Sequence, residues 1–235
     1  MALPRVNNPT YMLDLPSTGE KIKYRPFLVK EQKVLMMAQD TKKDAELAET
    51  MGQLVSSCTY GKVKPETAPM FDMEYAFLKI RSKSVGSKVD VIITCPDDEV
   101  TQVKTVVDLD EIEVQMLDNH SNEVNITDDV KIVFRYPILN DMIDLKDGAN
   151  DVDRVFHILE KCITSIHFGD DVYQKTDITE KELNTFVDEL TGEQFETLVD
   201  FFGSMPKLRH VVKITNPKTK VKSEVVLEGL ESFLE

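Results

Sequence analysis

The sequence predicts an α+β protein, in which antiparallel β-hairpins and a meander combine with a helical segment that contains an αα-hairpin. Three observations lead to this fold class. Apolar residues alternate at both ends and in the middle of the chain, they recur at helical spacing between these regions, and two capping boxes stand close together. The hydrophobic share of 41% is that of an ordinary globular chain.

The N-terminal half is predicted to begin with a hairpin and to continue through helices into strands. Alternation marks the strands, and recurrence every three or four residues marks the helices. Asp72 is in position to cap the third helix, and Gly61 and Gly86 are in position to end the second and third. The predicted elements are a hairpin over 11–24, helices over 34–38, 47–58 and 73–83, and an antiparallel meander over 88–135.

The C-terminal half is predicted to be helical at first. Apolar residues over 152–166 recur on one helical face. Thr179 with Glu182, and Thr191 with Gln194, form two capping boxes that predict the αα-hairpin. The chain is then expected to close with a hairpin over 211–227 and a short apolar turn over 229–235.

A polar, glycine-containing stretch over 144–150 is the predicted boundary between two parts of the chain. The first part, 1–145, holds the N-terminal hairpin, the helices and the meander. The second part, 146–235, holds the helical segment with the αα-hairpin and the C-terminal hairpin. One core shared by both parts is the alternative.

The charge of the chain argues against several classes of partner. With 28 basic and 42 acidic residues the net charge is −14, which repels phosphate backbones and anionic lipid, so we expect no nucleic-acid or membrane partner. No apolar run approaches the roughly 18 residues of a membrane-spanning helix, and the N-terminus does not resemble a secretory signal. Three widely spaced cysteines predict free thiols in a reducing compartment.

The search for chemistry finds no motif of an active site. Glycine-rich phosphate loops and a nucleophile elbow are absent from the sequence. Cys58, Cys95 and Cys162 are too far apart to form a metal motif, and His120 stands in a polar turn where we expect it to be solvated. We therefore expect no catalytic residues, no metal, no cofactor and no small-molecule substrate.

Two predicted hairpin turns repeat one another at an offset of 121 residues, with Ile93–Val100 matching Ile214–Val221. Both segments read as a strand, a proline-containing turn and a second strand. The charged residues of the two turns are Asp97, Asp98, Glu99, Lys218 and Lys220. Two interpretations stay open: similar turn chemistry used twice, or a duplicated unit whose oppositely charged tips steer docking between subunits.

Five strings, spread in order over nearly the whole chain, are Tyr24–Glu31, Phe77–Gly86, Phe201–Leu208, Thr215–Lys220 and Leu227–Leu230. They resemble segments of the baseplate hub proteins of T-even-like contractile-tailed bacteriophages. The resemblance implies a late-expressed, non-enzymatic protein that acts in assembly of the tail baseplate hub. Its implied partners are other baseplate hub proteins, and its implied locations are the host cytoplasm during assembly and the virion tail baseplate afterwards.

The candidate partner contacts are the two charged tips and the apolar C-terminal residues Leu230, Phe233 and Leu234. For Leu230 and Phe233 the alternative is that they close the core of the protein itself. Two other functions also stay open. The chain could be a chaperone of a hub subunit that is absent from the mature virion, or a tail-associated hydrolase, which would need two carboxylates at a defined separation.

Overall fold

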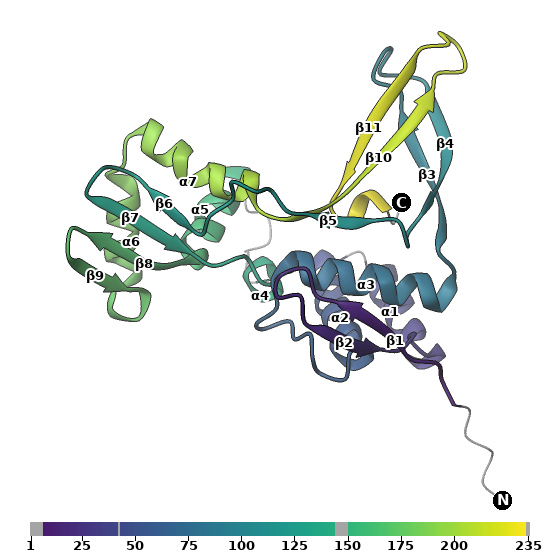
Figure 1. Ribbon diagram of the computed structural model, residues 1–235, viewed down its shortest axis with the longest axis horizontal. Helices are drawn as coiled ribbons and strands as arrows, with labels where there is room; N and C mark the ends of the chain where they lie inside the picture. The colour runs from purple at the N-terminus through teal and green to yellow at the C-terminus, as the bar shows by residue number, and fades with distance from the viewer. Residues whose placement is uncertain (1–6, 42, 144–149, 234–235) are drawn as a thin grey trace, which may run out of the picture. The chain divides into compact units, whose positions relative to one another are not determined.

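The structure, a computed structural model, describes residues 7–41, 43–143 and 150–233 (Figure 1). Its helices and antiparallel strands confirm the predicted α+β class. The chain forms two compact units, termed unit 1 (residues 1–115 and 207–235) and unit 2 (residues 116–206). Nearly all of the buried apolar side chains of the described residues fall into two groups, one in each unit.

In its described residues, unit 1 combines helices with small antiparallel sheets, whose strands pair as β1–β2, β3–β4 and β11–β10–β5. Helix α3 is central to its core, because Phe77 and Ile80 are buried and the helix contacts α2, β5 and β10. The elements are β1 (Tyr11–Asp14), β2 (Lys21–Tyr24), α1 (Val29–Thr41), α2 (Asp44–Cys58), α3 (Met70–Val85), β3 (Lys88–Thr94), β4 (Gln102–Asp108), β5 (Glu113–Gln115), β10 (Lys207–Thr215), β11 (Lys222–Glu228) and the 3-10 helix η2 (Glu231–Phe233).

Unit 2 is built on an antiparallel sheet of order β6–β7–β8–β9, against which helices pack. Phe134 of the sheet stacks on Phe201 of a helix, with ring centroids 4.7 Å apart. The described elements are β6 (Glu123–Asn125), β7 (Val130–Phe134), α4 (Leu139–Ile143), α5 (Asp151–Cys162), β8 (Ile163–Phe168), β9 (Asp171–Gln174), the 3-10 helix η1 (Lys175–Asp177), α6 (Glu180–Asp188) and α7 (Gly192–Ser204).

The division between the units differs from the boundary expected near residue 145. The first segment of unit 1 ends with strand β5, and its second segment begins with strand β10. These two strands pair in antiparallel fashion, with Gln115 opposite Lys207. Unit 2 is therefore an insertion whose two ends are held together by that pair. Local composition gives no sign of this pairing, because the two strands stand about ninety residues apart in the chain.

Several predicted elements are confirmed. The first hairpin, the break between α1 and α2, and both capping boxes of the αα-hairpin α6–α7 are present. Gly61 and Gly86 follow their helices with φ of +74° and +109°, a region that favours glycine.

The role predicted for Asp72 is wrong. Helix α3 begins at Met70 after Pro69, so Asp72 lies inside the first turn instead of capping it. Its carboxylate accepts a hydrogen bond from the backbone N–H of Ser17 at 3.0 Å and another from the Ser17 hydroxyl. The residue thus ties α3 to the turn of the first hairpin.

The predicted meander and the long helix are also corrected. Strands β3 and β4 pair with each other, but β5 pairs with β10, and β7 pairs with β6 and β8 in unit 2. Helix α5 ends at Cys162, and the residues from Ile163 to Ile166 belong to β8. The two isoleucines fit a helical face by spacing, but they and Thr164 between them are β-branched, which favours a strand.

The two units share a local arrangement that the sequence analysis missed, an arginine clamp at the end of a hairpin. In unit 1 the Arg25 N–H donates to the carbonyl of Cys58 at 3.0 Å, and its guanidinium donates to both oxygens of Glu31. In unit 2 the Arg135 N–H donates to the carbonyl of Cys162 at 2.8 Å, and its guanidinium donates to both oxygens of Asp141, again six residues on. Each clamp fastens a hairpin to the end of a helix.

Candidate protein-contact surfaces

The two charged hairpin turns lie together at one end of unit 1 (Figure 1). We term the β3–β4 and β10–β11 hairpins the twin-hairpin arm. One carboxylate joins their tips, because Asp97 accepts two hydrogen bonds from the Asn216 amide, both at 3.1 Å, and one from the Thr219 hydroxyl at 2.5 Å. The Asn216 side chain is buried by this contact. The tips therefore support each other within one chain.

The two turns share their backbone conformation through the matched positions. The N–H of Glu99 donates to the carbonyl of Cys95, and the N–H of Lys220 donates to the carbonyl of Asn216, each at 2.9 Å. Glu99 and Lys220 both have positive φ, at 55° and 64°. The turn between β3 and β4 is one residue longer than the turn between β10 and β11, and the extra residue follows Glu99. This agreement is compatible with both interpretations of the repeat.

The charges of both turns gather on one surface. Bonds from the hydroxyl and N–H of Thr101, at 2.6 and 2.9 Å, hold the pKa of Asp98 well below its usual range, so this carboxylate is ionised at neutral pH. Lys220 donates to the carbonyl of Pro217 at 2.8 Å, and Lys218 is exposed beside it. The surface is thus mixed in sign. A partner contact there stays a prediction.

The apolar C-terminal residues lie in the core of unit 1. Leu230 is 7% exposed and Phe233 is fully buried, and η2 contacts both β3 and β11. This position agrees with the alternative that Leu230 and Phe233 close the core of the protein itself. Leu234 lies outside the described residues, and a contact role for the segment stays a prediction.

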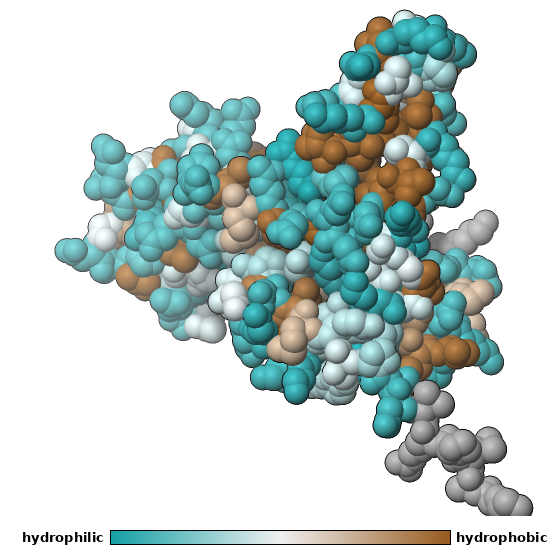
Figure 2. Space-filling model, turned by 45° about the vertical axis from the view of Figure 1, so that its right-hand side comes forward, coloured by the Kyte–Doolittle hydropathy of each residue, from teal (hydrophilic) through white to brown (hydrophobic). Residues whose placement is uncertain are grey.

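The outer faces of the arm expose apolar side chains between charged ones, and Figure 2 shows such patches along it. Val211 and Val226 stand directly opposite each other, 46% and 41% exposed. The ion pair of Lys213 with Glu224, at 3.2 Å, lies beside them. On the other hairpin, Ile92 is 65% exposed and Val106 is 57% exposed, and Ile92 stands opposite Lys104. Each outer face thus combines an apolar centre with charged neighbours, which is a composition typical of small protein contacts.

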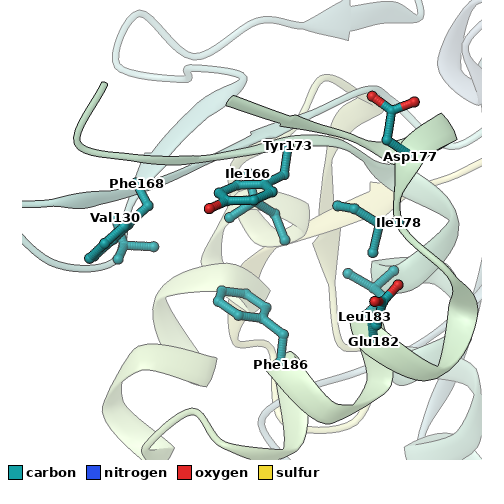
Figure 3. A pocket seen from close by; sticks show the side chains of 9 residues that line it. All are labelled: Val130, Ile166, Phe168, Tyr173, Asp177, Ile178, Glu182, Leu183 and Phe186. Carbon is teal, nitrogen blue, oxygen red and sulfur yellow. The ribbon is translucent and has the colours of Figure 1, made fainter. Parts of the chain in front are cut away.

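An apolar hollow opens in unit 2 between the sheet and helix α6 (Figure 3). Its volume is about 380 Å³. The β8 and β9 side chains Phe168 and Tyr173 form one side, and Phe186 of α6 faces Tyr173 across it. The carboxylates of Asp177 and Glu182 stand at one end. None of these three aromatic residues was a predicted site residue, although Gly169-Asp170 is a hairpin-turn signal that could have located β9.

The acidic charge of the chain is concentrated in unit 2. Residues 116–206 hold 20 of the 42 acidic residues but only seven of the 28 basic ones, a net charge of −13. The remaining 22 acidic and 21 basic residues leave unit 1 at −1. Unit 2 is therefore the source of nearly all of the net charge.

The histidines and cysteines do not form a reactive site among the described residues. All three cysteines are buried, and burial raises the pKa of the Cys58 thiol to about 11 and that of Cys162 to about 12. His120 is half-buried, contrary to expectation, because its ring stacks on Tyr136 and its Nδ1 lies 3.0 Å from the Ser204 hydroxyl. Burial lowers its pKa. No group of three His, Cys, Asp or Glu side chains in the described part of the chain could hold a metal.

We expect Asp97→Ala to loosen the end of the arm without unfolding unit 1. The variant removes three hydrogen bonds between the tips, two of them from the buried Asn216 amide, a loss of about 1–3 kcal/mol in local stability. Hydrogen exchange of the amides of residues 216–221 should become faster. Lys218→Ala at the same tip is the matched control and should leave exchange unchanged. Equal exchange in both variants would contradict the joining role of Asp97.

These features define a class of protein that acts through its surfaces, an α+β chain with exposed apolar side chains on its outer strands and an apolar hollow. The model of the family described as T4 bacteriophage base plate protein matches residues 8–235. The chain belongs to this family and is a T4-like phage baseplate protein, which confirms the family resemblance of the five strings. No curated protein and no solved structure matches it.

Membership gives the protein a structural or assembly role in the phage baseplate. It implies contacts with other phage tail proteins and points to the tail baseplate of the virion. Among the described helices there is also none with the length and apolar character needed to span a membrane.

Proposed function

We propose that the protein is a non-enzymatic component or assembly factor of the baseplate hub, and that it works through protein–protein contacts during tail assembly. The observation that carries the proposal is the twin-hairpin arm. Its inner apolar side chains, such as Val91, Ile93 and Ile214, are buried in unit 1, yet its outer faces expose further valines and an isoleucine. The arm therefore offers a strand face beyond what its own folding requires.

The outer face of β10–β11 has the composition of a small interface. The Val211–Val226 pair is apolar, and oppositely charged pairs in register border it on both sides: Lys213 with Glu224, and Arg209 with Glu228. An apolar centre with a charged rim favours one partner in one register, because the rim charges penalise a wrong alignment. Such a face suits a subunit that must join an assembly in order.

Peptide mass spectrometry of purified particles beside the infected-cell lysate separates the two forms of the proposal. A fixed ratio to other hub proteins in the particle identifies a structural component. Abundance in the lysate with absence from the particle identifies an assembly factor, including a chaperone of a hub subunit. Absence from both would contradict a role in the baseplate hub, and clearing of peptidoglycan in a zymogram would contradict its non-enzymatic nature.

We expect Val211→Glu to reduce the number of complete baseplates in infected cells. A charge in the centre of the apolar pair should weaken a contact there about tenfold or more, while the exposed position leaves the fold intact. The matched control is Met12→Glu on β1, whose side chain is 51% exposed in the same unit. Counting assembled tails by electron microscopy checks the prediction. Equal counts for the two variants would contradict a contact at this face.

A further inference from the structure

The hollow of unit 2 exposes more apolar surface than the fold of that unit needs. Phe168 is 56% and Tyr173 is 48% exposed, although both point into the same hollow as buried residues such as Leu183 (Figure 3). Both aromatic rings are about half exposed to solvent. A partner that covered them would bury further apolar surface, which favours binding. The hollow thus leaves large apolar side chains in contact with solvent.

The sheet beside the hollow also ends in an open edge. Strand β9 pairs with β8 on one side, and the described sheet has no strand on its other side. All four of its residues are exposed, and the strand carries Val172 as well as Tyr173. An exposed edge of this kind accepts an added strand, whose alternate side chains then reach toward one face of the sheet.

The acidic residues around this edge favour an added strand that carries basic side chains. Asp170 and Asp171 form the turn and start of β9, and Asp177 and Glu182 stand at the end of the hollow. The lysines nearest in sequence are Lys175, which donates to the carbonyl of Glu160 at 3.1 Å, and Lys181 on α6. With a net charge of −13 over the whole unit, the site attracts a basic segment and repels an acidic one.

Glu182 keeps its charge while it caps helix α6. Its carboxylate accepts from the hydroxyl and the N–H of Thr179, at 2.7 and 2.9 Å, which lowers the pKa of Glu182. In the equivalent box of α7, Gln194 makes the same contact with Thr191 without a charge. The chain itself therefore shows that Glu182→Gln removes the charge and retains the cap.

We propose that the hollow and the β9 edge bind an extended, lysine- or arginine-rich segment of another tail protein, which adds beside β9 and places a bulky apolar side chain between Tyr173 and Phe186. This inference rests on the proposed function, because it names one of the contacts through which the protein would work. Apolar burial in the hollow supplies affinity, and the carboxylates at its rim supply the preference for basic flanks. Unit 2 of a second copy is a poor occupant, since that unit carries a net charge of −13.

The first test uses the full chain and a labelled synthetic peptide, Lys-Val-Lys-Phe-Lys-Val-Lys, in fluorescence anisotropy. We expect binding that weakens about tenfold or more in the double variant F168S/Y173S and several-fold in D177N/E182Q. Raising the salt from about 50 to about 300 mM should weaken it as well. The control M36S/M37S, at similarly exposed positions on helix α1, should bind as the wild type does.

Several outcomes would overturn the inference. These are equal binding by all variants, equal binding of a peptide with glutamate in place of lysine, or no binding by the wild type. Loss of binding in F168S/Y173S supports the docking site only if the melting temperature of this variant is unchanged. D177N/E182Q tests the site independently, because it changes charges and no apolar side chain.

The second test places a photo-crosslinking amino acid at position 173 in the phage, with position 37 on helix α1, which is also exposed, as the control. We expect an adduct at position 173 to a basic segment of another tail protein. An adduct to an acidic segment or to a second copy, or no adduct while the protein is present in particles at a fixed ratio, would refute the docking site and leave the proposed function standing. Absence of the protein from both particles and lysate would instead refute the proposed function.

Discussion

Replacing Arg25 by methionine is expected to lower the free energy of unfolding of unit 1 by about 3–5 kcal/mol. The guanidinium holds the Glu31 carboxylate at 2.7 and 3.0 Å where both side chains are nearly buried, at 13% and 12% exposure. Methionine packs in a similar volume but leaves Glu31 with only the exposed Lys30, whose Nζ lies 3.9 Å away, so the desolvation of the Glu31 charge is no longer fully offset. Denaturant titration followed by hydrogen-exchange mass spectrometry would measure the loss, because it resolves peptides of unit 1 from those of unit 2.

The matched control is Lys21→Met, which removes an exposed ion pair with Asp14 from the same unit. Both side chains of that pair are 65% exposed, so the expected loss is within about 0.5 kcal/mol. The double variant R25M/E31L should recover much of the loss, because it leaves no unpaired charge. A loss in R25M no larger than in the control would contradict a stabilising role of the clamp.

The same clamp predicts how the stability of unit 1 depends on pH. Burial raises the pKa of Glu31, but bonds from Arg25, the Leu28 amide and Ser57 outweigh it and lower the value from 4.5 to about 2. The ionised form is thus favoured by folding, so the contribution is fully present above about pH 5 and is lost as the pH falls toward 2. Its size is about 3 kcal/mol. In Glu31→Gln the stability of unit 1 should therefore fall less steeply over this range.

Local features of the fold could be predicted where a short sequence motif determines the structure without a distant partner. The αα-hairpin carries two capping boxes in the chain itself, and Gly61 and Gly86 mark helix ends through their positive φ. In each case neighbouring residues determine the structure, so no distant partner has to be known.

Features that depend on distant partners could not be predicted. Alternation located β5 and β7 as strands but not their neighbours, because pairing is decided by residues far along the chain. The arginine clamps were missed for the same reason, since Arg25 and Cys58 meet only after a helix pair has folded between them. The hollow requires the sheet of unit 2 to pack on α6, and Tyr173 on its own reads as one exposed aromatic residue.

Phe233→Ala is expected to lower the free energy of unfolding of unit 1 by about 3–5 kcal/mol. The ring is fully buried in the core of that unit, on a short 3-10 helix that contacts β3 and β11. Removing it leaves a cavity among side chains that belong to different elements and cannot all move inward. Thermal melting with the hydrogen-exchange readout for unit 1 checks the value.

Phe168→Ala is the control of identical chemistry, because that ring is 56% exposed and its loss should change stability by less than about 1 kcal/mol. Measuring the hub association of Phe233→Ala beside its melting temperature separates the two roles open for the C-terminal segment. A core residue should affect hub association only through the fall in melting temperature, and restoring stability at lower temperature should restore association. Lost association with an unchanged melting temperature would instead make Phe233 a contact residue, and deletion of residues 229–235 should then leave unit 1 folded.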